Sequence, residues 1–368
     1  MTDSTASRTR SLFRARRVAL EVRQSIPWWI RSAIVTGSVF FGLGITFAIL
    51  VVAGVPPASI IEEFIVFTFL NSAGIATVVI DTAPLILVGL AAAAAFRINF
   101  WNIGLEGQFF MGVIGATLVV IYDIGPEWSR LPLMIIFAIV LGGIWALPPA
   151  WLKVRLKINE VITTLLFNYI AFYFVLNQVY GPWKDPVDNF PHSELYGEAE
   201  RLPTLGWEDV TWSVLVAGVA VAVVWWLVDR SRFGIKSRFS GINPSMALAV
   251  GLPVSLITLI SAAVSGGLAG SAGFVVASSQ EFRLTFGIAA GYGFSGIVIA
   301  FLAGNRPIGV LVVAFLMGGL YAAGDSLKIF YNLPDAVVSL IQAIVVLSVA
   351  GSEFFVRYRV RIARYEEH

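Results

Sequence analysis

The residues best able to do specific chemistry are a few polar side chains set within long apolar runs. Ionisable and amide side chains are costly in hydrocarbon, and those found there mostly face a polar pathway or another helix. Amide donors and acceptors suit a polar, uncharged solute, whereas an amino acid would be better served by an apolar site with one ion pair. Six residues are candidates for a pathway: Asp81, Asn102, Glu106, Gln108, Asn168 and Gln342.

These residues also admit other roles. Asp81 and Glu106 could pair with Arg97 or stand near an interface that water reaches. An Asn or Gln in a membrane span commonly joins two helices through hydrogen bonds, and this alternative stays open for Asn168 and Gln342.

Residues 97–108 hold two asparagines, two glycines and a carboxylate at the start of an apolar run. This pattern predicts a broken helix, which membranes tolerate only against protein or water and which often marks a transport site. The alternative is a cap on the cytoplasmic side, in which Asn102 ends the loop and Glu106 favours the helix N-terminus.

The elements that must position these residues are membrane spans. The chain is 58% hydrophobic and 13% charged, against roughly 45–50% and about 25% in soluble domains, which excludes a soluble enzyme. About 20 apolar residues in a helix cross the hydrocarbon core. Runs of this length predict an all-α, polytopic membrane helical bundle with about ten transmembrane helices, at residues 33–53, 76–96, 103–122, 131–152, 161–180, 211–228, 254–277, 286–303, 307–326 and 336–355.

Two other segments need interpretation. Residues 59–75 are apolar but begin with a pair of glutamates, and we expect an interfacial or partly inserted segment there instead of a further span. The first run is too long for the apolar part of a signal peptide, so we expect an uncleaved span.

Gly266 and Gly270 form a small-residue pair typical of close helix packing, either inside the bundle or between subunits.

The distribution of basic residues predicts the orientation. With ten spans, 20 Lys and Arg lie on the side of the two termini and five on the other. The positive-inside rule makes the richer side cytoplasmic, in a multi-pass protein of the plasma membrane. The predicted parts are a basic N-terminal arm (1–32), the transmembrane domain (33–356) and a cytoplasmic tail (357–368). We expect the arm to contact membrane lipid, not nucleic acid.

The cytoplasmic loop 229–253 predicts a short capped helix. Asn243 suits the N-cap, Pro244 the first helical position and Gly251 the left-handed position after the end. The intervening residues include Ser245, Met246, Ala247 and Leu248. Such an apolar helix flanked by cations must be covered, either by the bilayer surface or by a groove in a cytoplasmic partner.

The outer loop 181–210 is the only long loop predicted on the opposite side. Its seven carboxylates outnumber its two cations. Long loops are often functional, so we expect either a docking surface for an external protein or a solvated acidic cover. The docking candidates are Lys184, Asp185 and Asp188.

Several kinds of chemistry have no support in the sequence. There is no cysteine, and the two histidines lie far apart, so we expect no metal site and no catalytic residue. No Gly is followed by Lys, which excludes a phosphate-binding Walker lysine. Energy must therefore come from an ion gradient, with Glu106 or Asp81 as ion ligands, or from a separate ATPase.

Six features of the sequence are typical of one family. They are Asn102–Gln108, Asn159–Ile170, Gly181–Pro186, Gly241–Gly251, Asn305–Gly309 and Gln342. In these the chain resembles the permease subunits of ATP-binding cassette (ABC) importers for nucleosides and simple sugars, which are related to branched-chain amino acid permeases. The resemblance covers most of residues 76–352.

The resemblance implies a division of labour among several subunits. It implies that the helix at 243–251 couples the permease to ABC ATPase subunits, which bind ATP and Mg²⁺, so that this chain needs no cofactor. It also implies an extracytoplasmic substrate-binding lipoprotein at the acidic outer face and a second, shorter permease in a heterodimer. We expect the pathway to lie between spans two to five and spans seven and eight.

Three other functions remain open at this point. One is an ion-coupled secondary transporter that uses Glu106 or Asp81, and another is an ABC permease for branched-chain amino acids. The third is a membrane scaffold without transport. Dependence of uptake on ATP or on a proton gradient would separate the two kinds of transporter, and a scaffold would show neither dependence.

Overall fold

The structure of the 368-residue chain is a computed structural model that describes residues 17–23, 26–289 and 291–363. The described residues are predominantly helical, which confirms the predicted all-α class. They divide into two compact units, one within residues 1–54 and 339–368 and the other within residues 55–338.

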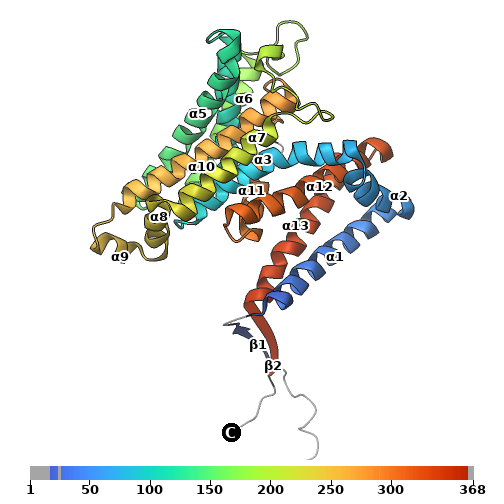
Figure 1. The fold of residues 1–368 in the computed structure, drawn as a ribbon, viewed down its shortest axis with the longest axis vertical. Helices are drawn as coiled ribbons and strands as arrows, with labels where there is room; N and C mark the ends of the chain where they lie inside the picture. Colours follow the sequence, from blue (N-terminus) through green and yellow to red (C-terminus); the bar gives the residue numbers. More distant parts are fainter. Residues whose placement is uncertain (1–16, 24–25, 290, 364–368) are drawn as a thin grey trace, which may run out of the picture. The chain divides into compact units, whose positions relative to one another are not determined.

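The first unit joins the two ends of the chain. It holds β1 (Arg17–Val22), α1 (Trp28–Val52), most of α13 (Asp335–Arg357) and β2 (Tyr358–Ala363). The strands pair antiparallel (Figure 1), with Val22 opposite Tyr358. The start of α1 and the end of α13, which follow β1 and precede β2, thus lie on one side of this unit, consistent with an even number of spans. Neither strand was predicted, and residues 1–16 of the arm and 364–368 of the tail lie outside the described residues.

The second unit carries the remaining helices. Its first part comprises α2 (Pro57–Ile61), the π-helix η1 (Glu62–Phe67), α3 (Ser72–Phe96), α4 (Leu105–Ile121), α5 (Glu127–Leu156), α6 (Glu160–Tyr180) and the 3₁₀ turn η2 (Glu198–Glu200). Its second part comprises α7 (Ser213–Trp225), η3 (Trp226–Arg230), α8 (Arg232–Ile242), α9 (Pro244–Ala249), α10 (Val254–Val276), η4 (Ala277–Glu281), α11 (Tyr292–Leu302) and α12 (Pro307–Tyr331).

Each predicted span corresponds to an apolar helix. Among the described residues, eight helices are long and apolar enough to cross a membrane. The other two predicted spans correspond to shorter apolar helices, α4 and α11. The polytopic helical bundle is thus confirmed, and the count of ten stays a prediction. Residues 59–75 form α2, η1 and the first turn of α3, separated by a break before Ser72.

The centre of the second unit is α10, which packs against α3, α4 and α5 (Figure 1). A Cβ on Gly142 of α5 would lie 2.9 Å from Cα of Gly270 in α10, and a Cβ on Gly266 would lie 2.7 Å from the side chain of Ala146. Only glycine allows so close an approach of two backbones. The predicted small-residue pair therefore serves packing inside this unit.

Candidate functional site

The segment between α3 and α4 is held by a network of buried amides. Asn102 donates from Nδ2 to Oε1 of Gln108 at 2.9 Å and to Oγ of Ser265 in α10 at 2.9 Å. Its Oδ1 accepts from Gln108 Nε2 at 3.0 Å and from the backbone N–H of Gly104 at 3.1 Å. Ser265 in turn donates to the carbonyl oxygen of Ala91 in α3 at 2.7 Å. The network therefore ties α3, α4 and α10 together at the predicted break.

Asn168 of α6 caps the start of a different helix, α4. Its Oδ1 accepts from the backbone N–H of Gly107 in α4 at 2.8 Å, and its Nδ2 donates to the carbonyl of Ile103 at 2.8 Å. Thr164, one turn earlier in α6, accepts from the N–H of Ile103 at 3.2 Å. Since the first N–H groups of a helix lack intrahelical partners, the side chain of Asn168 stabilises the start of α4.

Glu106 joins α4 to the start of α11. Its Oε1 accepts from the N–H of Gly291 at 3.0 Å, and its Oε2 accepts from the N–H of Gly293 at 2.7 Å. A carboxylate at a helix N-terminus is favoured by the unsatisfied N–H groups there. The predicted site residues Asn102, Glu106, Gln108 and Asn168 thus lie together around the start of α4.

The other two candidates belong to other helices. Asp81 lies in α3, and its electrostatic neighbours include Asp325 of α12. Gln342 belongs to α13, within the first unit. The possible pairing of Arg97 with Asp81 or Glu106 is wrong, because Arg97 forms an ion pair with Asp229 at 2.9 Å.

The cytoplasmic loop contains the predicted capped helix. Asn243 Oδ1 accepts from the N–H of Met246 at 3.0 Å, Pro244 is the first residue of α9, and Gly251 has a φ of +80°. The sequence did not predict α8, although Ser231 caps it by accepting from the N–H of Gly234 at 3.1 Å. An N-cap serine before an otherwise polar segment was the available signal.

Apolar side chains on and next to α9 are exposed. Ala247 is fully buried, whereas Met246, Leu248 and Val250 are 53%, 60% and 63% exposed. Three exposed apolar side chains, two on this short helix and one at its C-cap, leave a surface that a partner or the bilayer must cover.

Polar contacts connect the α8–α9 pair to the amide network. Asn99 Nδ2 donates to the carbonyl of Gly241 in α8 at 2.7 Å. Lys153 of α5 donates to the carbonyl of Asn99 at 2.7 Å and to Glu160 of α6 at 2.6 Å. Together with the pair Arg97–Asp229, these contacts hold residues 97–104 between α8 and the start of α4.

The outer loop 181–210 is bound to the rest of the second unit through its backbone. The N–H groups of Ser193, Tyr196 and Leu202 donate to the carbonyls of Leu284, Phe282 and Ser278 at 2.9, 2.7 and 2.9 Å. The loop is therefore a fixed surface over the end of α10 and η4.

Tyr196 anchors this loop from inside. Its hydroxyl lies 2.6 Å from that of Thr117 in α4, and the side chain is 1% exposed. Burial raises the pKa of the Tyr196 hydroxyl well above its ordinary value, and the charge of Glu200 adds to the rise, while the hydrogen bond between Tyr196 and Thr117 opposes it. Glu200 itself forms an ion pair with Arg130 of α5.

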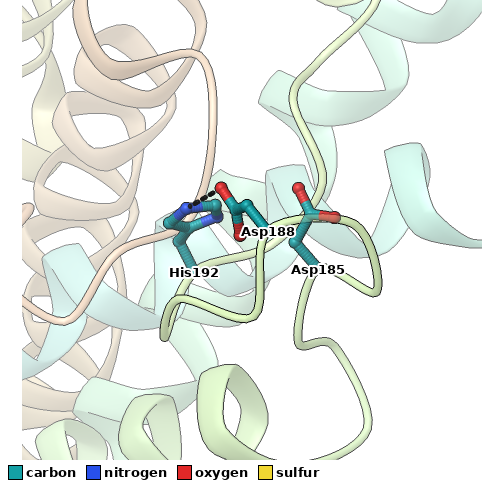
Figure 2. A group of neighbouring side chains, drawn as sticks. All are labelled: Asp185, Asp188 and His192. Carbon is teal, nitrogen blue, oxygen red and sulfur yellow. Dashed lines mark ion pairs between the residues drawn. The ribbon is translucent and has the colours of Figure 1, made fainter.

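Two of the docking candidates lie in a small cluster (Figure 2). Ligand atoms of Asp185, Asp188 and His192 lie within 4.8 Å of one another. His192 Nε2 lies 2.9 Å from Asp188 Oδ2 but also 3.0 Å from Arg283 Nη1. A guanidinium so close to the ring disfavours a metal ion there. The cluster is better explained as a contact that closes the loop, with Lys184 half-buried beside it.

An apolar pocket of about 930 Å³ lies between α5, α7 and α10. Its lining includes Ile139, Val219, Ile260 and Val264, with Trp212 at the start of α7. Because such a wall offers almost no hydrogen bonds, this pocket does not suit a polar solute.

Comparison with known proteins decides the family. Residues 74–350 match the family described as "Branched-chain amino acid transport system / permease component". The chain belongs to this family. It is therefore a membrane permease, a transport subunit and not an enzyme.

Relatives of this permease are named for transport of sugars and nucleosides. The glucose ABC transporter permease protein TsgB13 of Haloferax volcanii is 32% identical, over 94% of this chain and 93% of the relative. The guanosine ABC transporter permease protein NupP of Bacillus subtilis is 33% identical, over 73% of this chain and 78% of the relative. The chain is thus an ABC-transporter permease.

Among solved structures, the permease is similar to a putative metal-chelate type ABC transporter in an inward-facing conformation. The TM-score is 0.45 and the identity 17%, over 88% of this chain and 99% of that one.

Proposed function

We propose that this permease passes a nucleoside or a simple sugar through the membrane as the longer of two permeases in an ABC importer. The observation that carries the proposal is α9, a capped helix with exposed apolar side chains on the side predicted to be cytoplasmic. In this proposal α9 fits a groove of an ABC ATPase, which binds ATP and Mg²⁺ and supplies the energy.

The contacts behind α9 suggest how movement would reach the pathway. A shift of η3, α8 and α9 would pull on residues 97–104 through Asn99, which bonds to Gly241 of α8, and through the ion pair of Arg97 with Asp229 in η3. That segment holds Asn102, and the start of α4 follows it directly. In the proposal, this movement opens a gate formed by residues 97–104 and the start of α4. The gate is positioned by Asn102, Glu106, Gln108 and Asn168.

The relatives support the partners and the type of cargo. Two guanosine permease proteins of Bacillus subtilis, NupP and NupQ, are 33% and 25% identical to this chain, which favours a heterodimer of permeases. The fixed outer loop exposes acidic residues such as Asp188 beside apolar ones such as Phe190. We infer that this surface receives a substrate-binding protein.

The secondary-transporter alternative is disfavoured by the contacts of Glu106. Both of its carboxylate oxygens already accept backbone N–H groups, so Glu106 is engaged in positioning α11 and is not held ready for an ion.

The test is uptake of radiolabelled guanosine and glucose into energised membrane vesicles that contain the complete complex. We expect uptake of at least one solute to stop when ATP is removed and to continue when the proton gradient is collapsed. Uptake that follows the proton gradient and ignores ATP would contradict the proposal.

A further inference from the structure

The apolar pocket between α5, α7 and α10 has no part in the proposed function. Of the spans around it, α5 packs against α10, α10 against α3 and α3 against α7 (Figure 1). Side chains of α5 and α7 form its two walls, and α10 forms its floor together with the fully buried Leu87 of α3. Its volume of about 930 Å³ lies within the range of roughly 300–1,000 Å³ that is usual for ligand pockets.

The pocket has the depth of one membrane leaflet. Its outer end is marked by Trp212, which lies between the outer loop and α7. From there the lining advances by 11 or 12 residues on each helix, to Val223 on α7, over 135–147 on α5 and over 260–271 on α10. At about 1.5 Å per residue these stretches are about 16–18 Å long. One leaflet contributes about half of the roughly 30 Å hydrocarbon core, so the pocket spans the outer leaflet.

The polar groups of the lining offer little to a polar ligand. Ser271 donates its hydroxyl to the carbonyl of Leu268 in its own helix at 2.7 Å. Trp212 lies at the outer end, at the level of the membrane–water interface, where tryptophan is favoured. The pocket therefore selects an apolar chain whose polar end stays near Trp212.

The pocket is open along its length. Ile144 on the α5 wall and Leu215 and Val219 on the α7 wall are exposed. Exposed apolar side chains in the middle of a membrane span meet either lipid or another span. A void between them would forfeit the dispersion contacts of its lining. Either an acyl chain or a helix of another subunit therefore fills the pocket.

The walls suit an acyl chain better than a helix. A helix with its side chains is about 10–12 Å wide, and helices associate in membranes through small residues or polar side chains. The small residues here are already used between α5 and α10. A Cβ on Gly143 would lie 3.1 Å from the carbonyl oxygen of Ala263, and one on Gly267 would lie 3.1 Å from Cγ2 of Ile139. The exposed edge is made of branched side chains, to which a flexible chain adapts.

We propose that this pocket binds an acyl chain of an outer-leaflet phospholipid. The glycerol end of the lipid lies beside Trp212, and the chain runs between α5 and α7 toward Val223. This inference goes beyond the proposed function, because it holds whichever solute the permease carries.

Photolabelling of the complete complex in liposomes tests the site. The probe is a phosphatidylcholine with a diazirine in the middle of one acyl chain, and the labelled peptides are identified by mass spectrometry. Val219→Trp and Ile144→Trp each fill the pocket from one wall. Val312→Trp, at an exposed position of α12 outside the pocket, is the matched control.

We expect labelling of residues 135–147 and 212–223 in the wild type and in Val312→Trp. Both pocket-filling variants should show several-fold less labelling of these two segments. Absence of labelling there in the wild type, or equal labelling in Val219→Trp and Val312→Trp, would overturn the inference.

A second measurement identifies the occupant in the native membrane. The chain has no cysteine, so Val219→Cys carries a benzophenone maleimide at a single position of this chain. We expect illumination to attach phospholipid to this position. A crosslink to the second permease or to another protein would show that a helix fills the pocket, and the inference would be wrong. Neither measurement requires transport, so its failure is distinguishable from failure of the proposed function.

Discussion

At the scale of the residue, the buried amide side chains near the break between α3 and α4 link neighbouring helices. Asn168 satisfies a backbone donor and a backbone acceptor at the start of a neighbouring helix. A buried backbone group that loses its partner costs about 1–3 kcal/mol.

We predict that Asn168→Ala destabilises the purified protein by about 1–3 kcal/mol for each group left unsatisfied and lowers uptake. Asn177→Ala, an exposed position in the same helix, makes the same chemical change without this loss. The measurement is the thermal unfolding midpoint of both variants in one detergent. Equal midpoints would contradict the role of Asn168.

Tyr196 gives a prediction that depends on pH. A phenol whose pKa is raised in the folded protein contributes stability fully below its ordinary value near 10, and this contribution is lost as pH rises toward the folded value. We therefore predict that the wild type loses stability above about pH 10 more steeply than Tyr196→Phe. At neutral pH this variant is less stable, because it loses the hydrogen bond to Thr117, worth about 0.5–1.5 kcal/mol.

Unfolding midpoints measured from about pH 8 to pH 11 test this difference. Tyr180→Phe, at the exposed end of α6, should follow the wild-type curve. Parallel curves for the wild type and Tyr196→Phe would show that ionisation of this hydroxyl does not limit stability.

The sequence predicted the identity of these polar residues better than their partners. Asn102 and Gln108 are conspicuous because they interrupt an apolar run, but Ser265 lies 163 positions away from Asn102 and nothing local signals the bond. Likewise Asp81 is conspicuous in the sequence, but nothing local signals that its electrostatic neighbours include Asp325 of α12. A single chain sequence does not reveal which helices pack together.

At the scale of the element, α9 is the part that local sequence predicted most completely. Asn243, Pro244 and Gly251 each act through backbone geometry within a few residues, so no distant contact is needed to place them. The boundary of α3 shows the opposite case. It begins at Ser72 and not at Ala76, because Ser and Gly are tolerated in a helix that packing supports.

The ion pair between η3, just before α8, and residues 97–104 leads to a prediction about coupling. We expect Asp229→Asn to weaken the hold on Arg97, so that the ATPase still binds and hydrolyses ATP but uptake per ATP falls several-fold. The ratio of solute uptake to phosphate release measures this directly. A ratio equal to that of the wild type would show that this ion pair does not transmit movement to the pathway. Glu62→Gln, at an exposed position, is the control for loss of one carboxylate.

At the scale of the whole molecule, hydropathy and the placement of cations predict the orientation. The chain has no cysteine, so single introduced cysteines report on one position each. We predict that a membrane-impermeant maleimide labels Asp188→Cys in intact cells. Lys236→Cys in α8 should be labelled only after the cells are permeabilised. The reverse pattern would show that the positive-inside assignment is wrong.

The central claim is that the exposed apolar side chains of α9 bind an ATPase, and co-purification tests it most directly. The tagged chain is isolated from its native membrane and its partners are identified by mass spectrometry. We predict that the wild type brings an ABC ATPase and a second permease. Leu248→Asp should lose the ATPase, and Leu205→Asp on the outer loop should retain it. Recovery of the wild-type chain alone, or equal recovery of the ATPase with Leu248→Asp, would contradict the account.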